Sequence, residues 1–407
     1  MASLIWDFNE FMTRNFKSLA MGLTPSGHIH LGFLSTLACA FMYLREHPHT
    51  HLTITNIENS LSSSVEKYNG VPLRFQYLEE GDLLIPKDYN QLISRNSAGR
   101  RVQGEITSLI WKLAAMFDET TEDEKRKIKK SFIPPKHKRF LELKENKVFH
   151  VFGTQIYVYS FMRMLEKDRA FRRKMIKNLT DFEFAKQVAP MCGIKPRWKR
   201  FASQVKIGTK IYQANCFQIP VRLYCPNCHQ LCRDWAVMVF GHPYHHGPTL
   251  AAPCKNTRGN CPRALKTVGY DGYVYRNLKQ ELDMTEFHFM LDPMRDFYDP
   301  FKADCHIYGG DYFQLPNIKG ITGAQKIKIM FDYLEEKTGQ QKFLFGGPLI
   351  TIKGEKMSKS GQAFNIKDIK NIKKAFKNIM KKLEKVRSET YPNGIQVEYT
   401  EIMKNVA

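Results

Sequence analysis

A glycine- and histidine-rich stretch near the amino terminus has the residue types that bind phosphate. It reads Thr24-Pro25-Ser26-Gly27-His28-Ile29-His30-Leu31-Gly32. Gly27 and Gly32 remove side chains where the backbone or a ligand must come close. The free N–H groups of a helix start attract anions, and His30 can donate a hydrogen bond to a phosphate oxygen. The stretch predicts a phosphate-binding corner, and the alternative is a plain strand, turn and helix with two surface histidines.

A second stretch, near the carboxyl terminus, carries two lysines and two hydroxyls. It reads Gly354-Glu355-Lys356-Met357-Ser358-Lys359-Ser360-Gly361, and its flanking glycines predict a mobile loop. Two ammonium groups on such a loop can follow negative charge onto a leaving pyrophosphate, and loop closure can exclude water. An isolated lysine–serine loop is usually a solvated turn, but the ordered string KMSKS is rare by chance.

A third stretch, Asp304 to Tyr312 (DCHIYGGDY), places two glycines and an acid after an apolar segment. Gly309 and Gly310 would let a flat adenine approach the backbone, and the Asp311 carboxylate could accept hydrogen bonds from both ribose hydroxyls. These residues predict an adenosine site, and a turn after a core strand is the alternative.

Nine cysteines and histidines between these stretches could supply ligands to a metal. We predict a structural zinc site held by Cys225, Cys228, Cys254 and Cys261, because four thiolates close a tetrahedral site and the Cys-Pro-Asn-Cys turn aims two sulfurs at one ion. The second pair is spaced more widely than in a standard knuckle. A presumed ligand could therefore be replaced by Cys232 or by one of the histidines His229, His242, His245 and His246.

The elements around the first stretch form a βαβ unit. Residues 17–23 predict a buried strand, and residues 51–57 alternate like a second one. Between them, Phe33, Leu34, Leu37, Phe41 and Leu44 fall on one helical face, which ends before Pro48. Such a unit makes a right-handed crossover in a parallel sheet, with its ligand site at the carboxyl end of the strand. Chemistry is therefore expected at residues 24–33.

The remaining pattern predicts an α/β fold: a Rossmann-like parallel-sheet nucleotide-binding domain, interrupted by a large mixed insertion with a zinc-binding subdomain. Helices are expected at 97–117, 161–179, 323–337 and 365–387, and strands at 303–308 and 342–344. We predict four regions. Residues 1–84 are the first half of the catalytic domain, 85–285 the insertion with the cysteines of 225–261, 286–362 the second half, and 363–407 a basic helix with a short extension.

Composition limits the class of protein. The 407 residues carry a formal net charge of +22, so nucleic acid, nucleotide or an anionic membrane are natural partners. No apolar run reaches membrane-span length and the first residues lack a signal-peptide pattern, which predicts a cytoplasmic protein without a membrane partner. Nine unevenly spread cysteines do not form a secreted disulfide framework in a chain of this length.

The first two stretches resemble the two signatures of class I aminoacyl-tRNA synthetases, called HIGH and KMSKS, in the correct order. His30-Leu31-Gly32-Phe33 stands at HIGH, and Lys356 to Ser360 matches KMSKS letter for letter. Phe33 replaces the second histidine of the generic family, a position where class I lysyl enzymes have asparagine. The string TPSGHIHLG, the segment Leu291 to Asp296 (LDPMRD) and the clustered cysteines are similar to those of the class I lysyl enzymes.

The resemblance implies ATP-dependent activation of lysine and its transfer to the 3′ end of tRNA, specifically tRNA-Lys, with Mg²⁺ bridging the phosphates. His30, Lys356 and Lys359 would be catalytic. The ATP-binding set would comprise Thr24, Pro25, Ser26, Gly27, His28, Gly32, Gly309, Gly310, Asp311, Met357, Ser358 and Ser360. Class I lysyl enzymes have an acid-rich segment after the second strand, whereas residues 56–61 here hold one acid, Glu58, our candidate for the lysine ammonium.

The end of the chain is shorter than the resemblance implies. Class I lysyl enzymes carry a helical anticodon-binding region after KMSKS, whereas residues 361–407 have room for one basic helix and a short extension. The chain could charge tRNA through acceptor-stem contacts alone. Alternatively, it is a truncated paralogue with a non-tRNA acceptor, or a catalytically silent RNA-binding protein. The lysines of 365–387 and the segment Arg197-Trp198-Lys199-Arg200 either form solvated surface or contact RNA phosphates.

Overall fold

The structure of this chain is a computed structural model. It describes residues 2–23, 29–56, 67–68, 71–72, 102–117, 147–161, 164, 170, 205–207, 210–212, 215–218, 221–223, 225–228, 232, 234, 236–240, 249–258, 260–277, 287–289, 303–314, 322–357, 365–366, 369–387 and 394–406.

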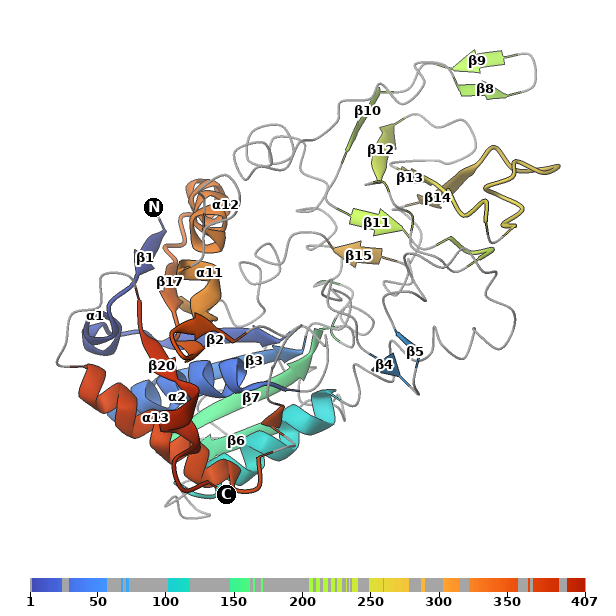
Figure 1. Cartoon of the computed structure of the whole chain (residues 1–407). Coiled ribbons are helices and arrows are strands. Elements are labelled where there is room, and N and C mark those ends of the chain that lie inside the picture. Colours follow the sequence, from blue (N-terminus) through green and yellow to red (C-terminus); the bar gives the residue numbers. More distant parts are fainter. Residues whose placement is uncertain are drawn as a thin grey trace. The chain divides into compact units, whose positions relative to one another are not determined.

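The main sheet has seven strands in the order β1-β17-β16-β2-β3-β7-β6 (Figure 1). Neighbouring strands pair in parallel throughout, except that β6 is antiparallel to β7. The strands are β1 (Ser3–Ile5), β2 (Ser18–Leu23), β3 (His51–Asn56), β6 (Lys147–Val151), β7 (Thr154–Ser160), β16 (Cys305–Tyr308) and β17 (Phe343–Gly346). The predicted parallel-sheet α/β fold is confirmed.

The strand order changes direction between β2 and β16. From β2 the chain passes through α2 (Leu31–Glu46) to β3, and from β16 it passes through α12 (Gly323–Thr338) to β17 on the other side. Right-handed crossovers in opposite directions place these helices on opposite faces of the sheet. The contacts agree, because His306 packs on Phe331 of α12, with ring centroids 5.2 Å apart, whereas Ile307 belongs to the core around α2. Ligand sites of such sheets lie at this switch point, at the carboxyl ends of the strands.

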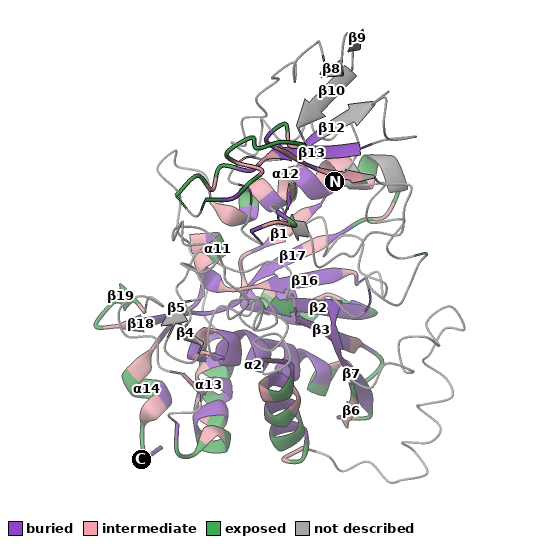
Figure 2. Cartoon of the chain, turned by 90° about the vertical axis from the view of Figure 1, so that its right-hand side faces the viewer, coloured by how far each residue is buried: buried purple, intermediate pink, exposed green. Residues whose placement is uncertain are grey.

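Helix α2 is the centre of the core. Almost all of its side chains are buried, as the purple ribbon of Figure 2 shows, because other helices cover the side that the sheet leaves open. One is the helix of residues 102–114, which buries Ile106 and Ile110 against this core. Another is α13 (Ile372–Val386), whose Phe376 meets Phe41 edge to face at 5.3 Å. Two short helices of the same unit are α1 (Phe8–Thr13) and α11 (Gly310–Gln314).

Helix α13 begins later than its apolar stripe predicts. The stripe starts at Ile366, but the helix starts at Ile372, where the Asn371 side chain accepts a hydrogen bond from the Lys374 N–H at 3.1 Å. Ile366 and Ile369 still pack against the core, which is why they extend the pattern. After α13, β20 (Gln396–Glu398) joins β18 (Leu349–Ile352) and β19 (Glu355–Lys356) in a three-stranded sheet, and α14 (Tyr399–Met403) ends the fold.

The chain divides into two compact units. The first comprises residues 1–57, 100–160 and 296–407, and the second comprises 58–99 and 161–295. The main sheet is thus interrupted twice, whereas the sequence pattern suggested one insertion over 85–285. The difference arises at the β6–β7 hairpin, which turns at Phe152 and Gly153 (φ 50° and 72°) and returns β7 to pair with β3.

The second unit contains a four-stranded antiparallel sheet in the order β10-β12-β13-β14. Its strands are β10 (Asn215–Gln218), β12 (Val237–Phe240), β13 (Thr249–Pro253) and β14 (Tyr273–Asn277). Three two-stranded pairs accompany it: β4 (Lys67–Tyr68) with β5 (Val71–Pro72), β8 (Val205–Ile207) with β9 (Lys210–Tyr212), and β11 (Val221–Leu223) with β15 (Phe287–Phe289). Among the described residues, no helix is long and apolar enough to cross a membrane.

Candidate active site and cysteine cluster

The described end of the amino-terminal motif, residues 29–32, lies at the start of α2, beside the switch point. His30 is the N-cap residue of α2, and its side chain makes no capping hydrogen bond. Its ring lies over Gly32, because a β-carbon on Gly32 would be 2.9 Å from the imidazole Cε1 and Nδ1. Gly32 therefore leaves room for the ring at the start of the helix, beside the first free backbone N–H groups.

Phe33, which stands at the position of the second family histidine, belongs to the core. It is 4% exposed and packs with the other apolar residues of α2. Its side chain therefore contributes to burial of α2 rather than to a surface that a phosphate could reach.

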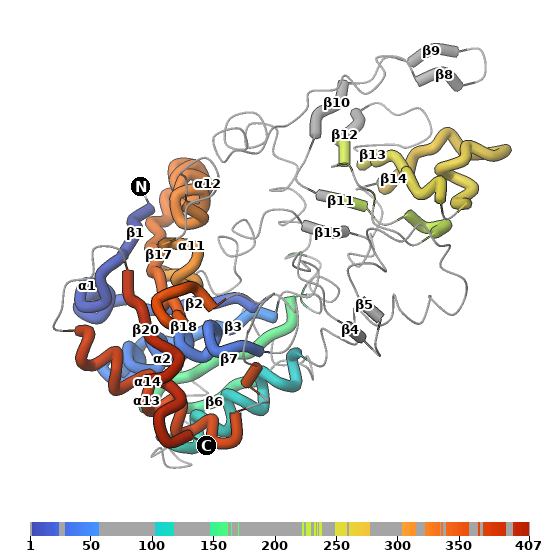
Figure 3. The backbone as a smooth tube through the Cα atoms, in the orientation of Figure 1, coloured from blue at the N-terminus to red at the C-terminus, as the bar shows by residue number. Residues whose placement is uncertain are grey.

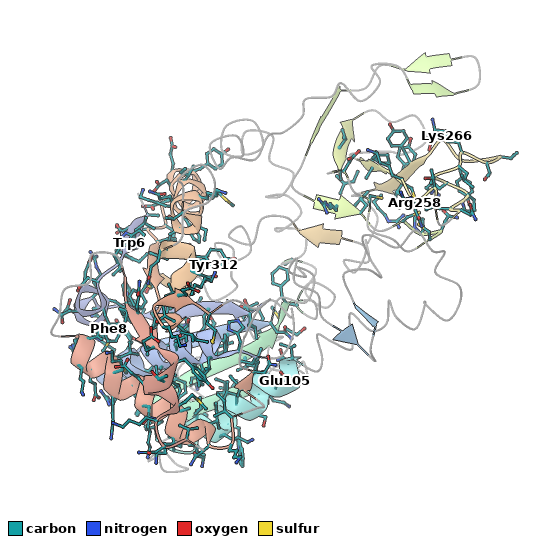
Figure 4. All side chains as sticks on the ribbon, viewed as in Figure 1. Trp6, Phe8, Glu105, Arg258, Lys266 and Tyr312 are labelled. Carbon is teal, nitrogen blue, oxygen red and sulfur yellow. The ribbon has the colours of Figure 1, made fainter. Side chains whose placement is uncertain are left out.

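The third stretch begins the other half of the switch point. Strand β16 ends at Tyr308, and Gly310 starts α11. A β-carbon on Gly310 would be 2.4 Å from the Gly347 carbonyl oxygen and 2.6 Å from the Leu349 nitrogen, so two backbones touch there. Tyr312, labelled in Figure 4, extends from α11 and is 43% exposed.

We expect Gly310→Ala to destabilise the protein by about 3 kcal/mol, because the obstructing atoms are backbone and cannot rotate away. Urea unfolding followed by circular dichroism measures the change. Gly104→Ala is the matched control, since a β-carbon on Gly104 meets nothing within 4 Å and alanine favours the helix. Equal stability of the two variants would contradict the close approach.

Lys356 and Asp311 meet at this edge. The Lys356 Nζ lies 3.1 Å from Asp311 Oδ2, and the side chains are 36% and 42% exposed. The sequence predicts different roles for them, pyrophosphate for Lys356 and ribose for Asp311. The structure brings these two predicted site residues together, although they come from separate stretches of the chain.

Both ends of the KMSKS loop are anchored near the predicted site. At its start, the Met357 N–H donates to the Ile350 carbonyl at 3.0 Å, which extends the ladder of β18 and β19. At its end, Asn365 forms an isolated antiparallel bridge with His30, and the Ile366 N–H donates to the Ile29 carbonyl at 2.8 Å. The described residues on either side of 358–364 therefore lie beside Asp311 at one end and beside His30 at the other.

A carboxylate that the sequence analysis did not single out also reaches this corner. Glu105, on the helix of residues 102–114 (Figure 4), accepts a hydrogen bond from the Ile29 N–H through Oε2 at 3.3 Å. No local motif marks Glu105, because its role depends on how its helix packs beside α2.

Other predicted residues lie outside the part of the chain that the structure describes. They are Thr24, Pro25, Ser26, Gly27, His28, Glu58, Arg197, Trp198, Lys199, Arg200, His229, His242, His245, His246, Ser358, Lys359, Ser360 and the segment 291–296. Of the helix predicted at 161–179, only residues 161, 164 and 170 are described.

The four predicted zinc ligands converge in the second unit. The sulfurs of Cys225, Cys228, Cys254 and Cys261 lie within 4.8 Å of one another, and all four residues are buried. The Sγ atoms are 3.9 Å apart for Cys225 and Cys261, 3.8 Å for Cys228 and Cys254, and 3.6 Å for Cys254 and Cys261. Tetrahedral zinc with bonds of about 2.3 Å separates its sulfurs by about 3.8 Å, so the cluster fits this ion.

Polar contacts hold the Cys-Pro-Asn-Cys turn. Asn227 donates to the Tyr270 hydroxyl at 2.9 Å and accepts from the Arg263 Nε at 3.0 Å. The Arg263 guanidinium also lies over the Tyr270 ring, 4.5 Å from its centroid. Sulfur–sulfur contact raises the pKa of Cys228 and lowers that of Cys225.

Cys232 is buried but does not join the four-sulfur group. Its N–H donates to the Leu223 carbonyl at 2.8 Å. Burial raises the pKa of the Cys232 thiol.

Comparisons with known proteins add little. No known protein family matches the sequence, and no curated protein is significantly similar to it. One solved structure with some likeness is a Campylobacter jejuni protein provisionally named an arginyl-tRNA synthetase. The likeness covers 98% of this chain and 71% of that one, with 8% identity and a TM-score of 0.34. Similarity this weak identifies neither a family nor an activity, so the case for a function rests on the residues themselves.

Proposed function

We propose that this chain activates an amino acid with ATP and transfers it to the 3′ end of tRNA. One observation carries the proposal. The KMSKS loop starts beside the Lys356–Asp311 pair and ends at His30, at the switch point of a parallel sheet. Loop lysines, a helix start and a carboxylate beside glycines are the groups that ATP activation uses, and here they share one edge.

In the proposed reaction, the amino acid carboxylate attacks the α-phosphate of ATP and pyrophosphate leaves. His30 and the start of α2 hold phosphates, while Gly309, Gly310 and Asp311 hold adenosine. Lys356 and Lys359 stabilise the leaving pyrophosphate, and Mg²⁺ neutralises phosphate charge. Asp311 and Lys356 lie side by side, so the carboxylate can bind ribose while the neighbouring ammonium binds phosphate.

Lysine is the proposed amino acid, and tRNA-Lys the proposed acceptor, on the resemblance to class I lysyl enzymes. Selecting lysine requires a shielded carboxylate, since an unpaired ammonium costs several kcal/mol to bury. Glu58 remains the candidate. The test is ATP–pyrophosphate exchange measured with each of the twenty amino acids, followed by charging of total tRNA with the one that supports exchange.

The same measurements separate the alternatives. A truncated paralogue with a non-tRNA acceptor would show exchange without charging. A catalytically silent RNA-binding protein would show neither and would still bind RNA. The intact KMSKS string favours an active enzyme.

We propose that Cys225, Cys228, Cys254 and Cys261 hold a structural zinc ion. Four sulfurs fill all four positions, so the site has no open position for a water or substrate. The ion would fix the loop of residues 254–272, which carries the exposed Arg258 and Lys266 (Figure 4).

A row of lysines on α13 is the proposed contact for RNA phosphates. Its members on the helix are Lys373, Lys374, Lys377 and Lys381, and Lys370 lies two residues before the helix; all five are exposed. The opposite face buries Phe376, Ile379 and Leu383, which fixes the lysines outward. Nearby acids are already paired, Glu384 with Arg45 and Glu401 with Lys382. A net charge of +22 predicts binding to polyanions, and these exposed lysines are a surface to which RNA phosphates could bind.

Replacing Lys373, Lys374 and Lys377 by glutamine is expected to weaken tRNA binding about tenfold and to reduce the slope of log affinity against log salt by about 2. Amino acid activation should not change. The matched control replaces three scattered exposed lysines, Lys17, Lys112 and Lys147, and removes the same charge. Equal weakening by both triples would mean that only net charge matters, and would reject the row as a site.

A further inference from the structure

The segment Gly394–Glu398 contacts both halves of the candidate nucleotide site. We propose that it is a positioning element, which fixes α11 and the β18–β19 hairpin so that Asp311 and Lys356 meet at the correct distance. The inference rests on the proposed function for its catalytic consequence. Figure 3 shows β20 running beside β18, in agreement with their parallel pairing of Leu349 with Gln396 and of Thr351 with Glu398.

The first contact is with α11, the helix that carries Asp311. The Gln314 Nε2 donates to the Ile395 carbonyl at 2.9 Å, and the Leu349 N–H donates to the same oxygen at 2.8 Å. Gly394 has φ of +84°, and a β-carbon there would lie 2.7 Å from the Gln314 Nε2. One carbonyl therefore joins the end of α11 to the start of β18, and the neighbouring glycine makes the approach possible.

The second contact is with the turn of the β18–β19 hairpin. Its central residues, Lys353 and Gly354, both have positive φ, 52° and 80°. The Glu398 carboxylate binds this turn from β20: Oε1 accepts from the Gly354 N–H at 2.7 Å, and Oε2 accepts from the Lys353 N–H at 3.1 Å. Oε1 also accepts from the Thr351 hydroxyl at 2.8 Å.

These bonds, chiefly the one from Thr351, lower the pKa of Glu398. Hydrogen bonds to the ionised form are the cause, so the carboxylate is charged at neutral pH. Because the folded-state pKa is lowered, the ionised Glu398 stabilises the folded protein at any pH above the pKa of an unfolded glutamate. This stabilisation is lost as the pH falls through the lowered pKa of the folded state.

The positions of the two contacts explain the positioning role. Lys356 follows the clamped Gly354 by two residues, and Asp311 lies one helical turn from Gln314. Helix α14 is held to α13 by a different side chain: Asn378 donates to the carbonyls of Ile402 at 2.9 Å and Lys404 at 3.0 Å. Glu398 can therefore be altered while α14 stays attached to α13.

The experiment compares Glu398→Ala, Glu398→Gln and the control Glu401→Gln in the full-length protein. Glu401 is a matched control, because it lies three residues further on and pairs with the half-buried Lys382 instead of the hairpin. Hydrogen–deuterium exchange at neutral pH reports the hairpin over residues 349–357. ATP–pyrophosphate exchange reports kcat and the KM for ATP.

In Glu398→Ala, we expect the amides of Lys353 and Gly354 to exchange about tenfold faster or more. We also expect kcat/KM for ATP to fall about tenfold or more, because small misplacements near reacting groups can lower the rate up to about a hundredfold. Glu398→Gln keeps one acceptor oxygen and should rescue part of both effects. Glu401→Gln should change neither, and all variants should keep cooperative thermal unfolding.

The two proposals fail in different ways. If the wild-type protein shows no ATP–pyrophosphate exchange, the proposed function is wrong, but amide exchange still reports whether Glu398 holds the hairpin. If the wild type is active and Glu398→Ala keeps normal amide protection and normal kcat/KM, the positioning role is overturned. Faster amide exchange with unchanged kcat/KM would also overturn it, because the clamp would then be structural only.

Discussion

Lys356→Ala is expected to slow amino-acid-dependent ATP–pyrophosphate exchange by about a hundredfold or more. The reason is that its ammonium would stabilise charge that appears on pyrophosphate only as the bond to the α-phosphate breaks. An interaction made mainly in the transition state lowers kcat and kcat/KM together when it is removed, with little change in KM. Steady-state exchange rates over a range of ATP concentrations measure this pattern.

Loss of the Lys356–Asp311 pair itself should not unfold the protein. Both side chains are more than a third exposed. Ion pairs of this kind contribute about 0–1 kcal/mol, which is small against a typical free energy of unfolding of about 5–15 kcal/mol. A large loss of activity with an unchanged unfolding midpoint would therefore report on chemistry.

Lys353→Asn is the matched control for Lys356→Ala. Lys353 is an exposed lysine in the same hairpin, and asparagine tolerates its positive φ of 52°. It should retain nearly normal exchange. If Lys356→Ala and Lys353→Asn were equally active, the KMSKS loop would not be part of the site.

Asp311→Asn should act differently, by raising the KM for ATP more than it lowers kcat, because ribose contacts exist before and during the reaction.

Much of the first unit could be predicted because its signals are local. The βαβ unit follows from an apolar strand, a glycine turn and a helical stripe, and the structure confirms it as β2, α2 and β3. In the second unit, the convergence of four sulfurs could also be predicted. The two cysteines of one turn face the same way, and a tetrahedral site needs two further sulfurs to be complete. The start of α13 was predicted too early, because the apolar stripe continues back to Ile366, which packs against the core although α13 begins only at Ile372.

The remaining features depend on tertiary pairing that no local pattern contains. Glu398 lies in the string QVEYT, which resembles any exposed strand end, and only the parallel pairing of β20 with β18 aims it at the Lys353–Gly354 turn. Glu105 is equally unmarked in sequence. The return of residues 147–160 to the main sheet was missed because an alternating apolar strand does not specify its partner. Long-range register is therefore the information that the sequence pattern lacked.

Removing one of the proposed zinc ligands is expected to have the largest structural effect. In Cys254→Ser, we expect loss of the bound zinc and unfolding of the cysteine-bearing loops, because apparent zinc-binding energies of about 10–16 kcal/mol in small domains match or exceed the whole free energy of folding. Cys254 is the informative position, since its sulfur lies close to those of both Cys228 and Cys261. Elemental analysis of the purified protein gives the metal content, and limited proteolysis of residues 225–272 gives the local unfolding.

Cys232→Ser is the matched control, because Cys232 is a buried cysteine of the same unit that lies outside the four-sulfur group. It should retain one zinc ion per chain and normal resistance to proteolysis. The sulfurs of the group stand 3.6–3.9 Å apart where neighbours are in contact, far beyond the roughly 2.0 Å of a disulfide. A chelator should therefore reproduce the Cys254→Ser result in the wild-type protein, and a reductant should not. If Cys254→Ser kept its zinc while Cys232→Ser lost it, Cys232 would be the fourth ligand and the proposed set would be wrong.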